Sequence, residues 1–246
     1  MSNKQFSSLF IVGSGQIGSK FFSALFSKFF PGILALHEPA PNLLQLGINK
    51  YRQGLTTQQV IDAVAQQRQW VAGLMRQEGK SIYLESNGML WLTVPELTKV
   101  FPNNRVLYIV RNPIDFVVSA GNRVMPDGTY FYAPPNRDFY LTPADLRDTE
   151  IQELWPGFSR HDKIAWYWLK CNEYLFEEYT TGTEMMMVRF EDLFYAATKT
   201  EMLKAVVAFF GLDYQLNDAE VQAFFNTRVN ETTKQSGQAE PPVINP

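Results

Sequence analysis

The stretch that most constrains the fold of this chain is residues 106–119, VLYIVRNPIDFVVS. Residues 106–110 form an apolar, β-branched run without turn residues, which predicts a strand buried on both faces of a parallel sheet. Residues 111–113 end the run, and helical spacing begins near Asp115, whose carboxylate favours a helix N-terminus. A strand followed directly by a helix predicts an α/β fold, with a central parallel β-sheet flanked by helices.

Arg111 and Ser119 are the polar candidates of this stretch. Arg111 would stand at the carboxyl end of a strand, where open α/β sheets bind their ligands. Ser119 follows eight residues later, about two helical turns away, and therefore shares a face with the start of the helix. A guanidinium and a hydroxyl that converge there can hold a phosphate. The alternative is an Arg in a structural ion pair and a Ser on a solvated helix face.

A second segment also predicts a phosphate site. Apolar residues 10–12 precede the sequence GSGQIGSK at residues 13–20, and an apolar helix follows over residues 21–30. A strand, a Gly-rich turn and a helix form the geometry in which free backbone N–H groups and the helix dipole hold an anion. Ser19 and Lys20 would add a hydroxyl and a positive charge.

Three interpretations of this Gly-rich segment remain open. Gly13, Gly15 and Gly18 match G-x-G-x-x-G, and Glu38 lies 20 residues after the last of them, as expected for an NAD(P)-dependent oxidoreductase. The segment also approaches the G-x-x-x-x-G-K-[ST] pattern of P-loop kinases, with Lys and Ser in swapped order. A third interpretation includes residues 111–119 as well.

The strand-loop-helix, together with R-x-P-x-D at residues 111–115 and Ser eight residues after the Arg, resembles the sulfotransferase family. In that family the first loop holds the 5′-phosphosulfate of the donor PAPS (3′-phosphoadenosine 5′-phosphosulfate), and the Arg and Ser hold its 3′-phosphate. The resemblance continues over most of the chain, in family order, through FPG at 30–32, HEP at 37–39, YLESN at 83–87, PEL at 95–97, FP at 101–102, VRFEDL at 188–193 and LKAVVAFFGL at 203–212.

This resemblance implies a P-loop-like sulfotransferase fold and transfer of a sulfuryl group from PAPS to a hydroxyl of a sugar, phenol or lipid. The product would be PAP (3′-phosphoadenosine 5′-phosphate), and no metal is expected. The resemblance assigns donor binding to Gly15, Gln16, Ile17, Gly18, Ser19, Lys20, Phe21, Arg111, Ser119 and, near the C-terminus, Arg228.

The reaction also needs a base for the acceptor hydroxyl. The resemblance favours Glu38, with His37 as a second candidate, and we expect the strand before them to lie next to the phosphosulfate loop. Glu38 has an alternative role as a cap or in an ion pair with a Lys. Glu85 would orient the acceptor or pair with Arg111.

One departure from the family pattern affects catalysis. Gln16 and Ile17 stand where the family has a basic residue and a Ser. Loss of one electrostatic donor typically costs about 10²–10³ in rate. Lys20 is therefore a candidate catalytic residue that would reach back over the loop. The alternative is a non-catalytic PAP- or PAPS-binding protein.

Composition limits the remaining possibilities. The 246 residues, 46% of them hydrophobic, predict one domain over residues 1–234 and a flexible tail over 235–246. A net charge of -3 argues against a general nucleic-acid partner, and Cys171, the single cysteine, excludes an intrachain disulfide. We find no signal peptide and no apolar run long enough to span a membrane, so we expect a cytoplasmic protein. The acceptor and the oligomeric state stay open.

Two longer segments complete the organisation. Residues 56–77 have helical spacing of apolar residues and predict one long amphipathic helix. Residues 123–160 lack any period and predict a long loop or lid over the acceptor site. Its aromatic residues would either form an apolar or sugar-stacking acceptor wall or anchor the loop to the core, and they are Tyr130, Phe131, Tyr132, Phe139, Tyr140 and Trp155.

Overall fold

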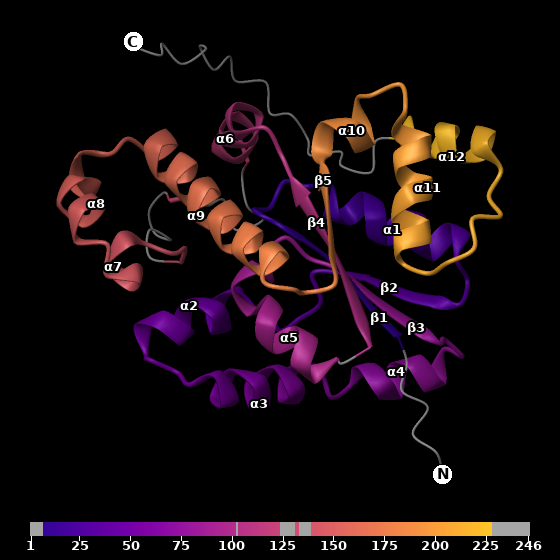
Figure 1. Ribbon diagram of the computed structural model, residues 1–246, viewed down its shortest axis with the longest axis horizontal. Coiled ribbons are helices and arrows are strands. Elements are labelled where there is room, and N and C mark those ends of the chain that lie inside the picture. The colour runs from indigo at the N-terminus through magenta and orange to yellow at the C-terminus, as the bar shows by residue number, and fades with distance from the viewer. Residues whose placement is uncertain (1–6, 102, 124–130, 133–138, 228–246) are drawn as a thin grey trace.

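The central feature of the molecule is a sheet of five parallel strands (Figure 1). The computed structural model describes residues 7–101, 103–123, 131–132 and 139–227. The strands lie in the order β2-β3-β1-β4-β5. Their bounds are Ser7–Gly13 for β1, Ile33–His37 for β2, Ile82–Ser86 for β3, Asn104–Val110 for β4 and Met185–Arg189 for β5. The predicted α/β fold with a central parallel sheet is thereby confirmed.

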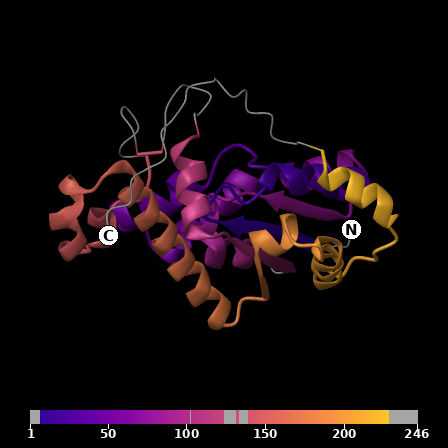
Figure 2. The same cartoon turned by 90° about the horizontal axis from the view of Figure 1, so that it is seen from above.

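Helices cover both faces of the sheet (Figures 1 and 2). One face packs against α1 (Ser19–Phe29), α10 (Phe190–Phe194), α11 (Lys199–Phe209) and α12 (Asp218–Phe225). The other packs against α2 (Leu44–Arg52), α3 (Thr57–Arg68), α4 (Val71–Gln77), α5 (Val94–Val100), α6 (Pro113–Gly121) and α9 (Arg160–Thr180). The shorter helices are η1 (Trp91–Thr93), α7 (Pro143–Leu146), α8 (Thr149–Leu154) and η2 (Trp155–Gly157).

Strand β4 shows why the sheet needs two helical layers. Its Val106 and Tyr108 belong to one hydrophobic core, whereas Leu107 and Ile109 belong to the other. A strand buried on both faces reads as a continuous apolar run, as residues 106–110 do. The connection after β1 runs through α1 on one face, and the connections after β3 and β4 run over the other. The carboxyl end of β1 is therefore a topological switch point, where such sheets bind ligands.

The predicted single helix over residues 56–77 is wrong, because the structure breaks it at Gln69 and Trp70. The preceding residue, Arg68, has its guanidinium fully buried against the sheet. Trp70 turns back and donates from its indole N–H to the carbonyl of Gln67, at 2.9 Å. Arg68, the last residue of α3, lies on the same buried face as Val60 and Val64 and brings a charge into the interior.

Residues 123–160 are also more regular than the sequence predicts in their second half. Thr142 and Asp145 form a capping box at the start of α7, and the Asp148 side chain caps α8. These helices have four and six residues, which is too short to leave a clear period. Residues 124–130 and 133–138 of this segment lie outside the described residues.

The aromatic residues of that segment anchor it to the core. Phe131, Tyr132 and Tyr140 are buried and pack around Tyr167 of α9. Phe131 and Tyr140 stack with centroids 3.9 Å apart. These three rings therefore anchor the segment to the core and do not form an exposed acceptor wall. Tyr130 lies outside the described residues, and Phe139 is 37% exposed.

Candidate functional site

The Gly-rich loop after β1 forms a cradle of left-handed backbone. Gly15 has φ 90°, Gln16 φ 53° and Gly18 φ 79°. Gly18 is the N-cap of α1, and no side chain caps this helix end. The first N–H groups of a helix have no intrahelical acceptor, and the helix dipole adds positive potential there. The loop can therefore accept an anion through its backbone.

Close packing on two sides holds this loop in place. A Cβ on Gly18 would lie 2.6 Å from the Phe194 ring, and a Cβ on Gly88 would lie 2.7 Å from Cα of Gly15. Both contacts require glycine, because no side chain fits there. Ile17 points into the core and is fully buried. The loop is thus wedged between α10 and the turn that follows β3.

Arg111 and Ser119 both reach this loop, although they come from the other segment of the sequence. The Arg111 guanidinium donates from Nη1 to the main-chain oxygen of Gln16, at 2.8 Å. The Ser119 hydroxyl donates to Oε1 of the same residue, at 3.3 Å. Among the described residues Arg111 forms no ion pair, and its guanidinium lies 4.5 Å from the Phe190 ring centroid. The two candidate phosphate ligands therefore converge on the candidate phosphate loop.

The end of β4 is fixed by its neighbours. The Trp168 indole N–H donates to the carbonyl of Arg111, at 3.0 Å. The backbone N–H of Asn112 donates to the Glu191 carboxylate, at 2.8 Å. The Asn112 side chain in turn accepts from the N–H of Ile114, at 2.9 Å, and so caps α6. These contacts set the direction of α6 and hence the position of Ser119 on its second turn.

Buried donors near the loop lack partners. The hydroxyls of Ser14, in the loop, and Ser86, at the end of β3, are buried without a hydrogen-bond partner in the described structure. Arg111 Nε is also buried without a hydrogen-bond partner among the described residues. A buried polar atom without a partner costs about 1–3 kcal/mol. A ligand with several acceptor oxygens would satisfy such atoms.

Glu38 and His37 lie further from the loop in the sheet than the sequence predicts. The strand β2 that carries them is not next to β1, because β3 pairs with both and lies between them. At the end of the strand, the N–H of Glu38 donates to the Ser86 carbonyl, at 3.2 Å. His37 Nδ1 lies 4.0 Å from the Glu38 carboxylate, and the two side chains are 21% and 26% exposed.

This strand order also bears on the dinucleotide interpretation. A dinucleotide site places its ribose-binding acid on the strand next to the Gly-rich loop. Glu38 instead follows β2, with β3 between it and β1. Glu38, the acid that the sequence spacing pairs with Gly13, Gly15 and Gly18, is thus not next to the Gly-rich loop in the sheet.

The predicted pairing of Glu85 with Arg111 is wrong, because the partner of Glu85 is Arg68. Arg68 donates from Nε and Nη2 to the two Glu85 oxygens, at 2.9 and 2.8 Å, and both side chains are fully buried. The carboxylate also accepts from Tyr83, at 2.6 Å, and from Asn87, at 3.0 Å. A buried charge pair needs such complete satisfaction to offset its desolvation.

Arg68 is the site-supporting residue that the sequence analysis missed. It donates from Nη1 to the Pro41 carbonyl, at 2.9 Å, in the loop after Glu38. Through Glu85 it also holds Asn87, whose side chain accepts from the Met89 N–H at 2.8 Å. One guanidinium therefore braces the loops after β2 and β3. The available signal was an Arg on the apolar face of an amphipathic helix.

The other predicted loop residues differ in their surroundings. Lys20 is exposed on the first turn of α1, and no described contact places its amine over the loop. Phe21 is buried in the core, with its ring centroid 5.0 Å from that of Phe194. Ser19 is partly buried at the start of α1. Arg228 lies outside the described residues.

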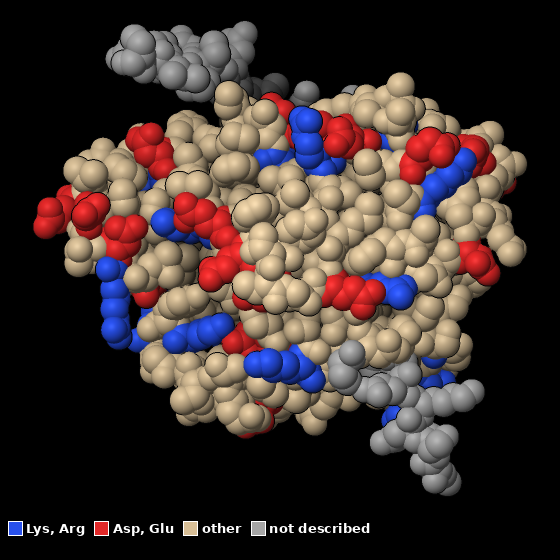
Figure 3. All heavy atoms as spheres, in the orientation of Figure 1, with Lys and Arg blue, Asp and Glu red and all other residues tan. Residues whose placement is uncertain are grey.

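Among the described residues, neither the surface charge on the face in Figure 3 nor a group of metal-binding side chains marks a site. On the face drawn in Figure 3, the described Lys and Arg side chains are interspersed with Asp and Glu. In the part of the chain that the structure describes, no three His, Cys, Asp or Glu side chains group to hold a metal ion. In the same part, every helix is too short or too polar to cross a membrane.

Comparison with known proteins yields structural neighbours only. No family model and no curated protein matches the chain. The sulfotransferase domain from the curacin biosynthetic pathway superposes with a TM-score of 0.51 and 14% identity, over 85% of this chain and 75% of its own. The sulfotransferase domain of the Synechococcus PCC 7002 olefin synthase superposes with a TM-score of 0.51 and 14% identity, over 87% and 77%. A sulfotransferase from Alicyclobacillus acidocaldarius gives 0.42 and 16%, over 89% and 91%.

The first two neighbours define the class of fold. At 14% identity, such a likeness shows a shared fold and not a shared function, since one fold can host many functions. The chain therefore has the α/β fold of sulfotransferase domains, as the resemblance implied. The function has to be argued from the site.

Proposed function

We propose that this chain is a sulfotransferase that transfers the sulfuryl group of PAPS to a hydroxyl. The observation that carries the proposal is the convergence of Arg111 and Ser119 on Gln16 of the Gly-rich loop. Their convergence lies at the carboxyl edge of β1 and β4, in a fold shared with sulfotransferase domains. The loop would hold the 5′-phosphosulfate, and Arg111 and Ser119 would hold the 3′-phosphate.

The residues present fit an anionic nucleotide. Arg111 Nε and the Ser14 hydroxyl are buried without partners among the described residues, and the N-terminus of α1 has no side-chain cap. The position of a Cβ on Gly15 has no atom within 4 Å, so the backbone is open to close approach there. Charge-assisted hydrogen bonds from a guanidinium and backbone N–H groups are the strong contacts that phosphates make.

The chemistry rests on positioning and charge. When bound, PAPS supplies an electrophilic sulfur with PAP as its leaving group. Glu38 would accept the proton of the acceptor hydroxyl while the hydroxyl oxygen bonds to sulfur. The S–O bond to PAP would break as the new bond forms, and its electron pair would go to the PAP oxygen. The N–H groups at the start of α1 would stabilise the developing negative charge, as in phosphoryl transfer. Sugars, phenols and lipids are the acceptor classes we propose.

A second candidate function follows from Gln16. This residue stands where the family has a basic residue, and its amide oxygen already accepts from Ser119. A chain without that cation would bind PAP or PAPS without transferring the sulfuryl group. The Gln16→Arg variant separates the two functions. Transfer by the natural chain identifies an enzyme, whereas PAP binding without transfer in both forms identifies a binding protein.

Calorimetric titration with PAP tests the donor site, with NAD and ATP as controls. The key variant is Arg111→Ala, and the matched control is Arg105→Ala, at the opposite end of the same strand. Arg105 pairs with Glu184 at 2.8 Å and lies away from the loop. We expect saturable PAP binding that only Arg111→Ala abolishes. Binding of NAD in the absence of PAP binding would overturn the proposal.

The acceptor side needs its own test. The chain, PAPS and a panel of sugar, phenol and lipid alcohols would be assayed for PAP release. The Glu38→Gln variant removes the proposed base but keeps its shape. We expect lower turnover with unchanged PAP affinity. Full turnover in this variant would show that His37 or another group, and not Glu38, is the base.

A further inference from the structure

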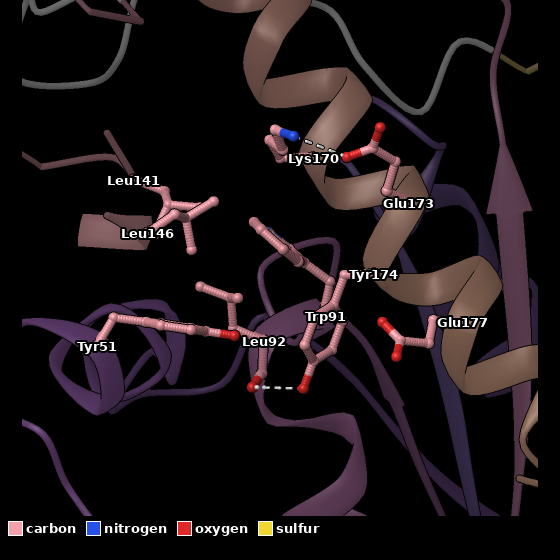
Figure 4. A pocket seen from close by; sticks show the side chains of 9 residues that line it. All are labelled: Tyr51, Trp91, Leu92, Leu141, Leu146, Lys170, Glu173, Tyr174 and Glu177. Atoms are coloured by element: carbon pink, nitrogen blue, oxygen red, sulfur yellow. Dashed lines mark hydrogen bonds and ion pairs between the residues drawn. The ribbon is translucent and has the colours of Figure 1, made fainter. Parts of the chain in front are cut away.

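A cavity separate from the phosphate loop lies between α2, η1, α7 and α9 (Figure 4). Its volume is about 230 Å³. Leu92, Leu141 and Leu146 give it an apolar lining. None of residues 13–21, 37–38 and 111–119 lines it. The cavity is therefore separate from the proposed donor site.

Three aromatic rings form the walls of this cavity: Tyr51, Trp91 and Tyr174. Trp91 is held by the hydrogen bond from its indole N–H to the Tyr167 hydroxyl, at 2.9 Å. The Trp91 and Tyr174 rings meet edge to face, with centroids 5.7 Å apart. In Figure 4 the Tyr51 side chain enters from α2, on the other side of Trp91 from α9. Aromatic faces carry negative potential and attract cations.

The rim of the cavity is acidic. Lys170 pairs with Glu173 at 3.0 Å, which leaves Glu177 without a cationic partner among the described contacts. Deeper in the fold, Glu96 pairs with Lys50 at 2.8 Å and is almost fully buried. Burial first, and then Glu96 and Glu177, raise the pKa of Tyr51. Lys50 also lies 6.0 Å from the Tyr174 ring centroid, so Tyr51 and Trp91 are the rings that face no cation in the described contacts. The ammonium groups of Lys50 and Lys170 stand against the carboxylates of Glu96, Glu173, Glu177 and Glu178, so the net charge of this region is negative.

Charge complementarity selects the occupant. We propose that this cavity binds an organic ammonium group, with its carbon substituents on the leucines and its charge between the rings and Glu177. An anion would meet a negative field and aromatic faces. A neutral group of the same shape would gain nothing from the aromatic faces or from Glu177 beyond its apolar contacts. Aromatic walls with an adjacent carboxylate are the chemistry by which proteins bind alkylammonium ions.

Calorimetric titration of the full chain with choline tests this proposal. The paired probe is the uncharged analogue of choline in which carbon replaces nitrogen, because both have the same shape. We expect choline to bind and the uncharged analogue to bind at least several-fold more weakly. Equal affinity for the two would overturn the proposal, as would the absence of choline binding.

Variants then assign the contacts. Tyr51→Leu keeps an apolar side chain but removes the ring, and Glu177→Gln removes the charge. Each should weaken choline binding by about two- to fivefold, the strength of one partly exposed cation–π or ionic contact. Tyr51→Phe should restore the affinity, and Glu153→Gln, an exposed carboxylate on α8, should leave it unchanged. Choline binding that neither Tyr51→Leu nor Glu177→Gln weakens would place the ligand elsewhere.

The PAP titration keeps this test independent of the proposed function. Tyr51→Leu and Glu177→Gln should leave PAP affinity unchanged, because neither residue touches the phosphate loop. Choline binding without PAP binding would support the ammonium site and overturn the sulfotransferase proposal. PAP binding without choline binding would support the donor site of the proposed sulfotransferase and overturn the ammonium site.

Discussion

The guanidinium of Arg111 lies 2.8 Å from the main-chain oxygen of Gln16, across 95 residues of sequence. The Gln16 side chain separately accepts from Ser119, at 3.3 Å. One loop residue therefore engages both side chains that are proposed to hold the 3′-phosphate. The contact with Arg111 uses the backbone oxygen of residue 16, whereas the contact with Ser119 requires the amide side chain.

Gln16→Ala should tighten PAP binding. The Ser119 hydroxyl would no longer be engaged by the amide and would be free for a phosphate oxygen. A neutral hydrogen bond contributes about 0.5–1.5 kcal/mol, which is about two- to tenfold in affinity. Ser119→Ala should weaken binding by a similar factor. Calorimetry with PAP measures both variants. Weaker binding by Gln16→Ala would show instead that its amide is itself a ligand of the nucleotide.

Gly18→Ala should destabilise the chain and disrupt the phosphate loop. The backbone has φ 79° there, and the new Cβ would lie 2.6 Å from the Phe194 ring. Gly54→Ala is the matched control, since it has φ 63° with no atom within 4 Å. The control should lose about 1–2 kcal/mol of unfolding free energy from backbone strain alone. Gly18→Ala should lose about 1–3 kcal/mol more from overpacking. Urea unfolding checks this, and equal losses would refute the Phe194 contact.

Arg68→Met should be among the most damaging substitutions outside the loop. It leaves the fully buried Glu85 carboxylate without its charge partner, which costs about 3–5 kcal/mol. The double variant Arg68→Met with Glu85→Leu should recover part of that loss, because no unpaired charge remains. Unfolding free energies of the two single variants and the double variant give the coupling. Additive losses would mean that the two side chains do not act as a pair.

Arg105→Met serves as the control for that experiment. Arg105 also pairs with a carboxylate, that of Glu184, but the two side chains are 37% and 62% exposed. An exposed pair contributes about 0–1 kcal/mol. Loss of this pair should therefore change stability little. A loss as large as that of Arg68→Met would point to packing of the arginine stem rather than to the burial of charge.

Asp145 should contribute to stability in a pH-dependent way. Burial alone would raise the pKa of its carboxyl, but the hydrogen bonds from Arg52 and Thr142 outweigh burial and lower it. The unfolded chain therefore takes up a proton at a higher pH than the folded chain. The stabilisation is complete well above pH 3.8, the ordinary value, and is lost as the pH falls through the lowered pKa.

The comparison of Asp145→Asn with the natural chain tests this direction of the pH dependence of stability. At neutral pH the variant should unfold more easily, by about 1–2 kcal/mol, from loss of the charge-assisted contact at 2.7 Å. In acid the two chains should converge, because the natural carboxyl is then protonated. Unfolding by urea across the acid range measures the difference. A gap that stays constant with pH would show that Asp145 acts through shape and not through charge.

Local patterns were enough to predict the elements around the site. The apolar run at residues 106–110, the helical spacing that begins near Asp115 and the glycines of the first loop each indicate the conformation of their own short segment. The strand β4, the start of α6 and the Gly-rich turn before α1 follow from these residues. The placement of Arg111 and Ser119 near the loop also follows, because the carboxyl ends of parallel strands share one edge.

The sequence by itself thus determined which segments are strands, turns and helices near the site, together with the continuous apolar run that buries β4 on both faces. Only the tertiary structure decided that β3 lies between β1 and β2, that Arg68 rather than Arg111 pairs with Glu85, and that Gln16 meets Ser119. The physical reason is the range of the interactions. A turn or a cap depends on residues a few positions apart, whereas strand order and the partner of a buried charge depend on which distant segments pack together.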